Sequence, residues 1–123
     1  MSKFHGREGK LKTVFLKDGR LPREEFTKDE MRILSLSCTR LDVNLRAQLD
    51  NNSLREVLLV DHEDLIETAE KALSDLCVKR IMTYENGYLK STPCIERISY
   101  YKEILAVTLN KDVFGLINSL LSH

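Results

Sequence analysis

Side chains able to carry out acid–base chemistry are sparse in this sequence. One cluster of titratable groups, His62-Glu63-Asp64, lies beside an expected turn. Adjacent residues at the start of a helix point in different directions, and general acid–base catalysis needs a partner within hydrogen-bond reach. We therefore expect this cluster to be solvated. The sequence predicts a protein that is not an enzyme and that needs no cofactor.

Sulfur ligands are equally sparse. The three cysteines, Cys38, Cys77 and Cys94, lie 39 and 17 residues apart. A zinc site needs three or four ligands at short spacings such as C-x₂-C, so no metal site is predicted. Cys38 and Cys77 fall on apolar helical stripes, where cysteine behaves as a small buried hydrophobe. Cys94 follows a proline in an extended segment, and we expect it to be the most exposed thiol.

Charge is distributed unevenly along the chain, although 19 basic and 19 acidic residues cancel overall. Residues 1–23 carry seven basic and two acidic side chains, a local charge of +5. Residues 60–78 carry six acids and one lysine, a local charge of −5, and residues 79–111 reach +3. Such runs are often no more than solvated faces. The sharper interpretation is a basic arm, an acidic helix and a weakly basic sheet.

Length and composition define the class of protein that must position these groups. The 123 residues are about one domain's worth of chain. With 42% hydrophobic residues, the chain is too apolar for a disordered protein. No apolar run approaches the roughly 18 residues that span a bilayer, and the first residues lack the apolar stretch of a secretory signal. We therefore expect a cytoplasmic protein with reduced thiols and no contact with a membrane.

The N-terminal segment is predicted to be a basic arm that ends in a strand. Residues 10–17 are β-branched and aromatic at their centre, and Asp18-Gly19 supplies the turn that follows. Two parts are therefore expected. The arm and its strand occupy residues 1–24, and a folded α+β domain occupies residues 25–123.

The first helix of the domain has a clear start. Thr27 and Glu30 have the spacing of a capping box, in which each residue satisfies the other's backbone amide. The apolar stripe that follows indicates a helix over residues 28–40. Leu45 and Leu49 either extend this helix or form a short separate turn.

Two more helices are expected before the strands begin. A second capping box, with Ser53 as the N-cap, predicts a short helix over residues 54–60. Asp61 is placed to cap a third helix over residues 62–77. A broad apolar stripe makes this long helix the clearest one in the chain.

Extended segments dominate the rest of the chain. Period-two alternation begins at Val78, and Asn86-Gly87 is a strong signal for a hairpin with a type I′ turn. The returning strand begins at Tyr88 and is interrupted at Pro93. Two further extended segments follow, at residues 94–101 and 105–109. A final helix is expected over residues 113–121, with Asn110 as its cap.

This order of elements predicts an α+β fold of the winged-helix type, a variant of the helix-turn-helix. It comprises an N-terminal strand, three helices, a β-hairpin with a further strand, and a C-terminal helix. The helices at 54–60 and 62–77 would form the helix-turn-helix pair. Residues 79–92 would form the wing.

A family likeness lies in the second half of the chain. It is carried by the run Ala69-Glu70-Lys71-Ala72-Leu73-Ser74-Asp75-Leu76, by Ile81 with the Asn86-Gly87 turn, by Tyr100-Tyr101, and by residues 107–113. In these residues the chain resembles the winged-helix domains of plasmid replication initiator (Rep) proteins. The residue pattern covers positions 69–121, and positions 26–121 can be laid on the same layout.

The resemblance implies binding of duplex DNA, with the long helix in the major groove and the wing against the phosphate backbone. It implies phosphate contacts from Lys79, Arg80, Lys90 and Arg97. The long helix departs from the family pattern, because a base-reading helix needs Arg, Lys, Asn or Gln. This helix carries acids instead, at Glu63, Asp64, Glu67, Glu70 and Asp75.

Two hypotheses of function follow. The first is a non-enzymatic winged-helix protein that binds double-stranded DNA in plasmid- or phage-type replication or transcription control. The second is a protein-interaction module (an inhibitor, adaptor or nucleic-acid mimic) whose acidic helix docks a basic protein partner. A homodimer is compatible with either hypothesis. The first hypothesis adds phosphate contacts from the arm, at Lys10, Lys12, Lys17 and Arg20.

The predicted sheet tyrosines could also stack on the bases of single-stranded nucleic acid. Cross-strand packing is the commoner role of tyrosines in a sheet.

Overall fold

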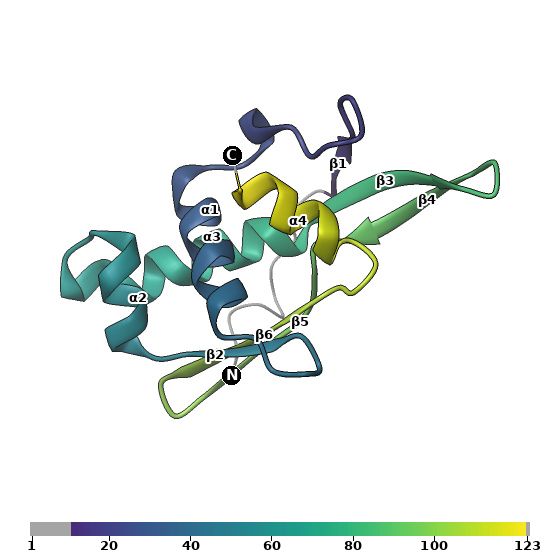
Figure 1. Ribbon diagram of the computed structural model, residues 1–123. Helices are drawn as coiled ribbons and strands as arrows, with labels where there is room; N and C mark the ends of the chain where they lie inside the picture. The colour runs from purple at the N-terminus through teal and green to yellow at the C-terminus, as the bar shows by residue number, and fades with distance from the viewer. Residues whose placement is uncertain (1–10, 123) are drawn as a thin grey trace.

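The computed structural model describes residues 11–122, and its order of elements is close to the one expected (Figure 1). A strand between the first two helices is the main addition. The helices are α1 (Lys28–Thr39), α2 (Asn51–Leu58), α3 (Leu65–Cys77) and α4 (Phe114–Leu121). The strands are β1 (Lys12–Phe15), β2 (Arg46–Leu49), β3 (Lys79–Glu85), β4 (Tyr88–Pro93), β5 (Ile95–Tyr101) and β6 (Ile104–Leu109).

Helix α1 begins where its capping box predicts. The Thr27 amide donates to Oε1 of Glu30 at 2.7 Å, and the Glu30 amide donates to Oγ1 of Thr27 at 3.1 Å. Both bonds of the box are therefore present, and the helix starts at the next residue. Its inward side buries Ile33, Leu34 and Leu36.

The short helix expected at residues 54–60 is present as α2, but the expectations for Leu49 and for the Ser53 cap were wrong. Leu49 belongs to strand β2, in which Ala47 and Leu49 are buried and Arg46 and Gln48 are exposed. Four alternating residues are too few to predict a strand from the sequence alone, because the preference for a strand here depends on pairing with a partner strand. The N-cap of α2 is Asp50, whose carboxylate accepts from the backbone amide of Ser53 at 2.8 Å, so Ser53 lies inside the helix.

The long helix is confirmed, but its start differs from the expected one. Residues His62–Asp64 form a 3₁₀ turn, and the backbone carbonyl of Asp61 accepts from the Asp64 amide at 2.9 Å. Helix α3 proper begins at Leu65 with no side-chain cap. The tighter turn takes up the first residues of the predicted helix, as is common at helix N-termini.

The strands form two three-stranded sheets, ordered β1-β3-β4 and β2-β6-β5. Strand β1 pairs parallel with β3, and the other pairs are antiparallel. A parallel pair needs a long crossover, and here the whole three-helix unit supplies it. In Figure 1 the β3–β4 hairpin projects away from the helices, whereas β2, β6 and β5 lie beneath them.

Two predicted turns are confirmed. Asn86 and Gly87 have φ of 53° and 83° and join β3 to β4. Asp18 and Gly19 have φ of 53° and 77°, inside a small bridge between Lys17 and Arg20. Positive φ at two successive positions is the type I′ geometry that Asn-Gly and Asp-Gly favour.

The core lies between the helices and the inner face of the second sheet, β2-β6-β5. Burying one large apolar side chain completely stabilises a fold by about 1.5–3 kcal/mol. Residues 12–24 join the same core through Val14 and Leu21. The fully buried large side chains include Ile33, Leu49, Leu54, Leu73, Leu76, Ile81, Leu105 and Ile117.

The prediction for Cys94 was wrong, because its side chain is fully buried. Desolvation by burial raises the pKa of the Cys94 thiol to about 12. The same cause raises the pKa of Cys77 to about 11 and shifts that of Cys38 in the same direction. Cys38 and Cys77 are half-buried against the core, in line with their place on apolar stripes.

Helix α4 closes the fold by packing against α1. Its N-cap is Val113, so the prediction that Asn110 caps this helix was wrong. Asn110 instead stabilises the preceding turn: its Oδ1 accepts from the Asp112 amide at 2.8 Å, and its carbonyl accepts from the Val113 amide at 3.2 Å. No helix within residues 11–122 is both long enough and apolar enough to cross a membrane.

Candidate nucleic-acid interface

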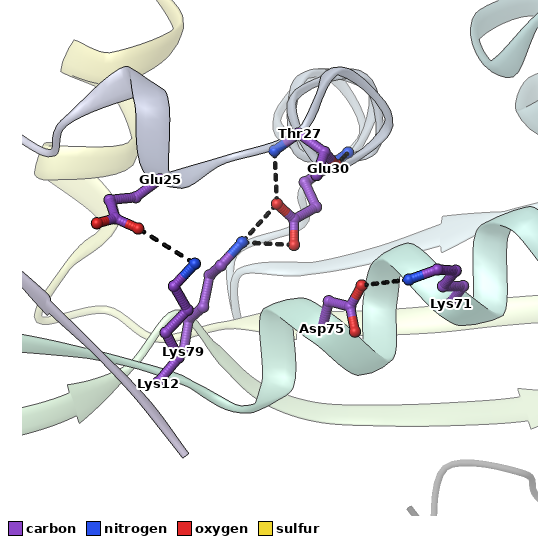
Figure 2. Close-up of polar contacts among 7 residues, drawn as sticks. All are labelled: Lys12, Glu25, Thr27, Glu30, Lys71, Asp75 and Lys79. Carbon is purple, nitrogen blue, oxygen red and sulfur yellow. Dashed lines mark hydrogen bonds and ion pairs between the residues drawn. The ribbon is translucent and has the colours of Figure 1, made fainter. Parts of the chain in front are cut away.

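Lys79 was predicted as a phosphate contact, and its burial contradicts that prediction. Its Nζ donates to both carboxylate oxygens of Glu30 at 2.5 and 2.6 Å (Figure 2). The Lys79 and Glu30 side chains are only 5% and 1% exposed. The ammonium also lies 4.9 Å from the centre of the Phe26 ring. Period two places residue 79 on a strand, but only its long-range contact with Glu30 of α1 shows that the side chain points inward.

The other two candidates on the β3–β4 hairpin reach solvent but have local partners. Lys90 lies 3.2 Å from a carboxylate oxygen of Glu85 and 3.2 Å from one of Asp112. These carboxylates, Glu85 first, raise the pKa of the Lys90 ammonium. Arg80 donates to Oγ of Ser91 at 3.0 Å and to its carbonyl at 2.9 Å. The charge of Lys90 is therefore balanced within the hairpin and its neighbouring loop, whereas Arg80 is held by neutral acceptors.

The arm candidates fall into three kinds. Lys10 lies outside the described residues. Lys12 pairs with Glu25 at 3.2 Å (Figure 2) and Lys17 with Glu24 at 4.0 Å, and both lysines are exposed. Exposed pairs are worth about 1 kcal/mol or less, so either lysine can exchange its carboxylate for a phosphate. Arg20 is exposed, and its side chain bonds no other residue of segment 11–122.

The second sheet presents a basic outer face. The β5–β6 register sets Arg97 opposite Thr108, and the β2–β6 register sets Arg46 opposite the same Thr108. Both arginines are exposed, and neither guanidinium has a hydrogen bond or ion pair to another described residue. Sequence reasoning named Arg97 but missed Arg46, because residues 45–49 were assigned to a helix or turn. The alternation of Arg46 and Gln48 with buried neighbours was the signal that could have found it.

The predicted acidic face is present on α3 and the turn before it. Glu63, Asp64 and Glu67 are exposed. Glu70 and Asp75 are partly buried and have partners, one of them the Lys71–Asp75 pair at 3.1 Å (Figure 2). A groove of about 430 Å³ runs between α3 and the start of α1, and its lining includes Asp29, Asp64, Glu67 and Asp75.

Base readout by α3 is therefore opposed by its own charge. Duplex DNA carries one negative charge per about 1.7 Å of its axis, and the exposed acids of α3 would meet that charge directly. A metal ion could bridge carboxylates and phosphates, but the described residues contain no group of three or more side chains placed to hold one. The acids and the unpaired arginines lie on different elements, α3 and the second sheet.

Comparisons with known proteins bear on the fold. No family model matches the chain, and no curated protein matches it by sequence. Among solved structures, the chain is similar to the WH1 domain of MSBI1.176, a replication protein isolated from a multiple sclerosis patient. The match has a TM-score of 0.66 at 13% identity and covers 80% of this chain and 86% of that one. The fold is therefore that of a winged-helix domain.

Proposed function

We propose that this protein is a non-enzymatic winged-helix protein that binds double-stranded DNA in plasmid- or phage-type replication or in transcription control. The fold shared with a domain of a replication protein supports the proposal. The observation that carries it is the exposed pair Arg46 and Arg97, whose guanidinium groups have no partner among residues 11–122. Solvent-exposed arginines of this kind are suited to bidentate contacts with phosphate.

Binding is expected to be led by phosphates and to depend little on sequence. The exposed carboxylates of α3 oppose deep insertion into a groove, whereas Arg20, Arg97 and the weakly paired Lys12 and Lys17 can approach a backbone. Phosphate contacts orient a protein on DNA but carry no sequence information directly. The affinity should therefore fall steeply with salt and differ little between random duplexes.

The test is to measure the affinity of the full chain for a random duplex at a series of salt concentrations, with fluorescence anisotropy as the readout. Each lost phosphate contact should flatten the slope of log K against log salt by about 0.9. Changing Lys12 and Lys17 to Gln should flatten the slope if the arm contacts phosphate, and it leaves strand β1 and the buried Val14 in place. A wild-type protein that shows no binding to duplex even at low salt would refute the proposal.

The acidic groove between α1 and α3 favours a second candidate function, the docking of a basic protein. Asp64 and Glu67 line it and are exposed. Changing Asp64 to Asn and Glu67 to Gln should weaken the binding of a lysine-rich peptide if this groove binds protein. The same change should tighten DNA binding if the first proposal holds, because it removes repulsion of phosphate. One variant thus separates the two functions.

A further inference from the structure

We infer that the outer face of the second sheet, with the tip of its β5–β6 hairpin, is the surface that binds the DNA backbone. We call this surface the outer sheet face and define it by Arg46, Gln48, Arg97, Ser99 and Lys102. The inference rests on the proposed function, and it makes β5–β6 the wing in place of residues 79–92.

Strand register assembles the face in rows. Arg46, Thr108 and Arg97 lie in one row across β2, β6 and β5, and Gln48, Ala106 and Ser99 lie in the next. Directly paired residues share one face of a sheet, and neighbouring strands are about 4.8 Å apart. The two arginines of the first row are therefore about 10 Å apart at their backbones, with a small threonine between them. One exposed arginine therefore lies on each outer strand of the sheet, with the half-buried Thr108 on the central strand between them.

An irregularity in β5 turns Arg97 onto this face. Residues two apart on a regular strand share a face, and Ile95 is buried in the core. The register shifts between Ile95 and Arg97, so that Arg97 is exposed instead of lying on the core side. Bulges commonly re-aim a side chain in this way beside functional sites. Ile98 and Val107 then continue the core side.

The carboxylates nearest in sequence to the two arginines are bound by neutral donors. Asp42 accepts from the backbone amides of Asn44 at 2.8 Å and Arg46 at 3.1 Å. Glu96 accepts from the side-chain amide of Asn110. Neither carboxylate forms an ion pair with Arg46 or Arg97 within the described chain. Neither guanidinium group is therefore occupied by a carboxylate of the described chain, and both can contact an external anion.

The tip of the hairpin holds two successive non-glycine residues at positive φ. Lys102 and Glu103 have φ of 48° and 66°, the geometry that Asp18-Gly19 and Asn86-Gly87 adopt in the other two turns. Those turns use residues suited to positive φ, whereas Lys and Glu are not. Strained residues persist mainly at functional sites. The lysine, held 5.2 Å from the centre of the Tyr101 ring, places an ammonium at the end of the outer sheet face.

The first experiment compares the two hairpins in the full chain. Arg46→Gln with Arg97→Gln should flatten the salt slope of binding to a random duplex by about 1.8, two phosphate contacts. The matched control is Arg80→Gln with Lys90→Gln on β3–β4, which should change the slope much less. The inference is overturned if the control pair flattens the slope and the sheet pair does not. That outcome leaves the proposed function standing, whereas a wild-type protein that fails to bind duplex overturns both.

The second experiment separates charge from strain at the tip. Lys102→Asn and Glu103→Asn each introduce a residue that tolerates positive φ, so both should raise the urea midpoint. Lys102→Asn should nevertheless lower the affinity for duplex about threefold or more at low salt and flatten the slope by about 0.9. Glu103→Asn should leave the affinity unchanged or raise it. Wild-type affinity in a folded Lys102→Asn protein would show that the tip does not contact DNA.

Discussion

Lys79 Nζ lies 2.6 Å from Oε2 of Glu30, and this contact joins the first strand of the projecting hairpin to the N-terminus of α1. Glu30 also accepts the amide of Thr27, so one carboxylate serves both the capping box and the ion pair. Both side chains of the pair are shielded from solvent, and their contact links the start of β3 to the start of α1. A charge pair in this position acts on the fold, and its lysine is not available at the surface.

Lys79→Met should lower the free energy of unfolding by about 3–5 kcal/mol, because it leaves the Glu30 carboxylate buried without its partner. Adding Glu30→Gln should recover part of the loss, since glutamine keeps the capping-box bond and removes the charge. Lys12→Met is the matched control, because Lys12 is the register partner of Lys79 on β1 and its pair with Glu25 is exposed. It should cost about 1 kcal/mol or less. Urea unfolding measures all four proteins, and equal losses for the two single variants would contradict the assignment.

Gly87→Val should lower the free energy of unfolding by roughly 1 kcal/mol or more, since a β-branched residue is disfavoured at its φ of 83°. No atom lies within 4 Å of a Cβ added there, so conformation and not crowding sets the cost. Gly115→Ala is the control: it also has open space but no positive φ, and it should be neutral or stabilising by up to about 1 kcal/mol. A neutral Gly87→Val would mean that the turn lies elsewhere.

Thr27→Ala should cost about 1 kcal/mol by removing the N-cap of α1. Combined with Gly87→Val, the two losses should add to within about 0.5 kcal/mol, because the capping box and the hairpin tip share no partner. Urea midpoints of the two single variants and the double variant provide the comparison. Strong non-additivity would show that the hairpin and the helical unit are coupled more tightly than their contacts indicate.

Asp50 should make stability depend on pH at acid values. The hydrogen bond from the Ser53 amide lowers the pKa of the Asp50 carboxyl from its ordinary value of 3.8. A lowered pKa gives a contribution that is present above the unfolded-state value and is lost as the pH falls through the folded-state value. Asp50→Ala should therefore reduce the urea midpoint at pH 6, with the difference shrinking below about pH 4. A difference that persists unchanged at about pH 2 would contradict this role for the charged cap.

The cysteines should react slowly in the native state and quickly after unfolding. Thiolate is the reactive form, and burial raises the pKa of Cys77 to about 11 and that of Cys94 to about 12. Labelling with an aromatic disulfide reagent at pH 8, followed by peptide mass spectrometry, should find Cys94 to be the last thiol modified. Early modification of Cys94 would show that the β4–β5 junction opens readily.

The sequence by itself determined the elements whose causes are local. The capping box at Thr27, the turns at Asp18-Gly19 and Asn86-Gly87, and the apolar stripe of α3 each depend on residues within a few positions of one another. These signals led to the winged-helix order of elements, and the structure confirms them. The resemblance to Rep winged-helix domains led to the same fold, which the similarity to a WH1 domain supports.

Tertiary structure decided everything that depends on a distant partner. Residues 46–49 form a strand only because they pair with β6, which lies nearly sixty residues later in the chain. Lys79 is withdrawn from solvent by a glutamate on α1, and Arg97 is turned outward by a shift in register against β6. Alternation in sequence marks which residues share a face, but it does not say which face meets the core. That choice depends on long-range packing, and it determines which cations of this protein reach its surface.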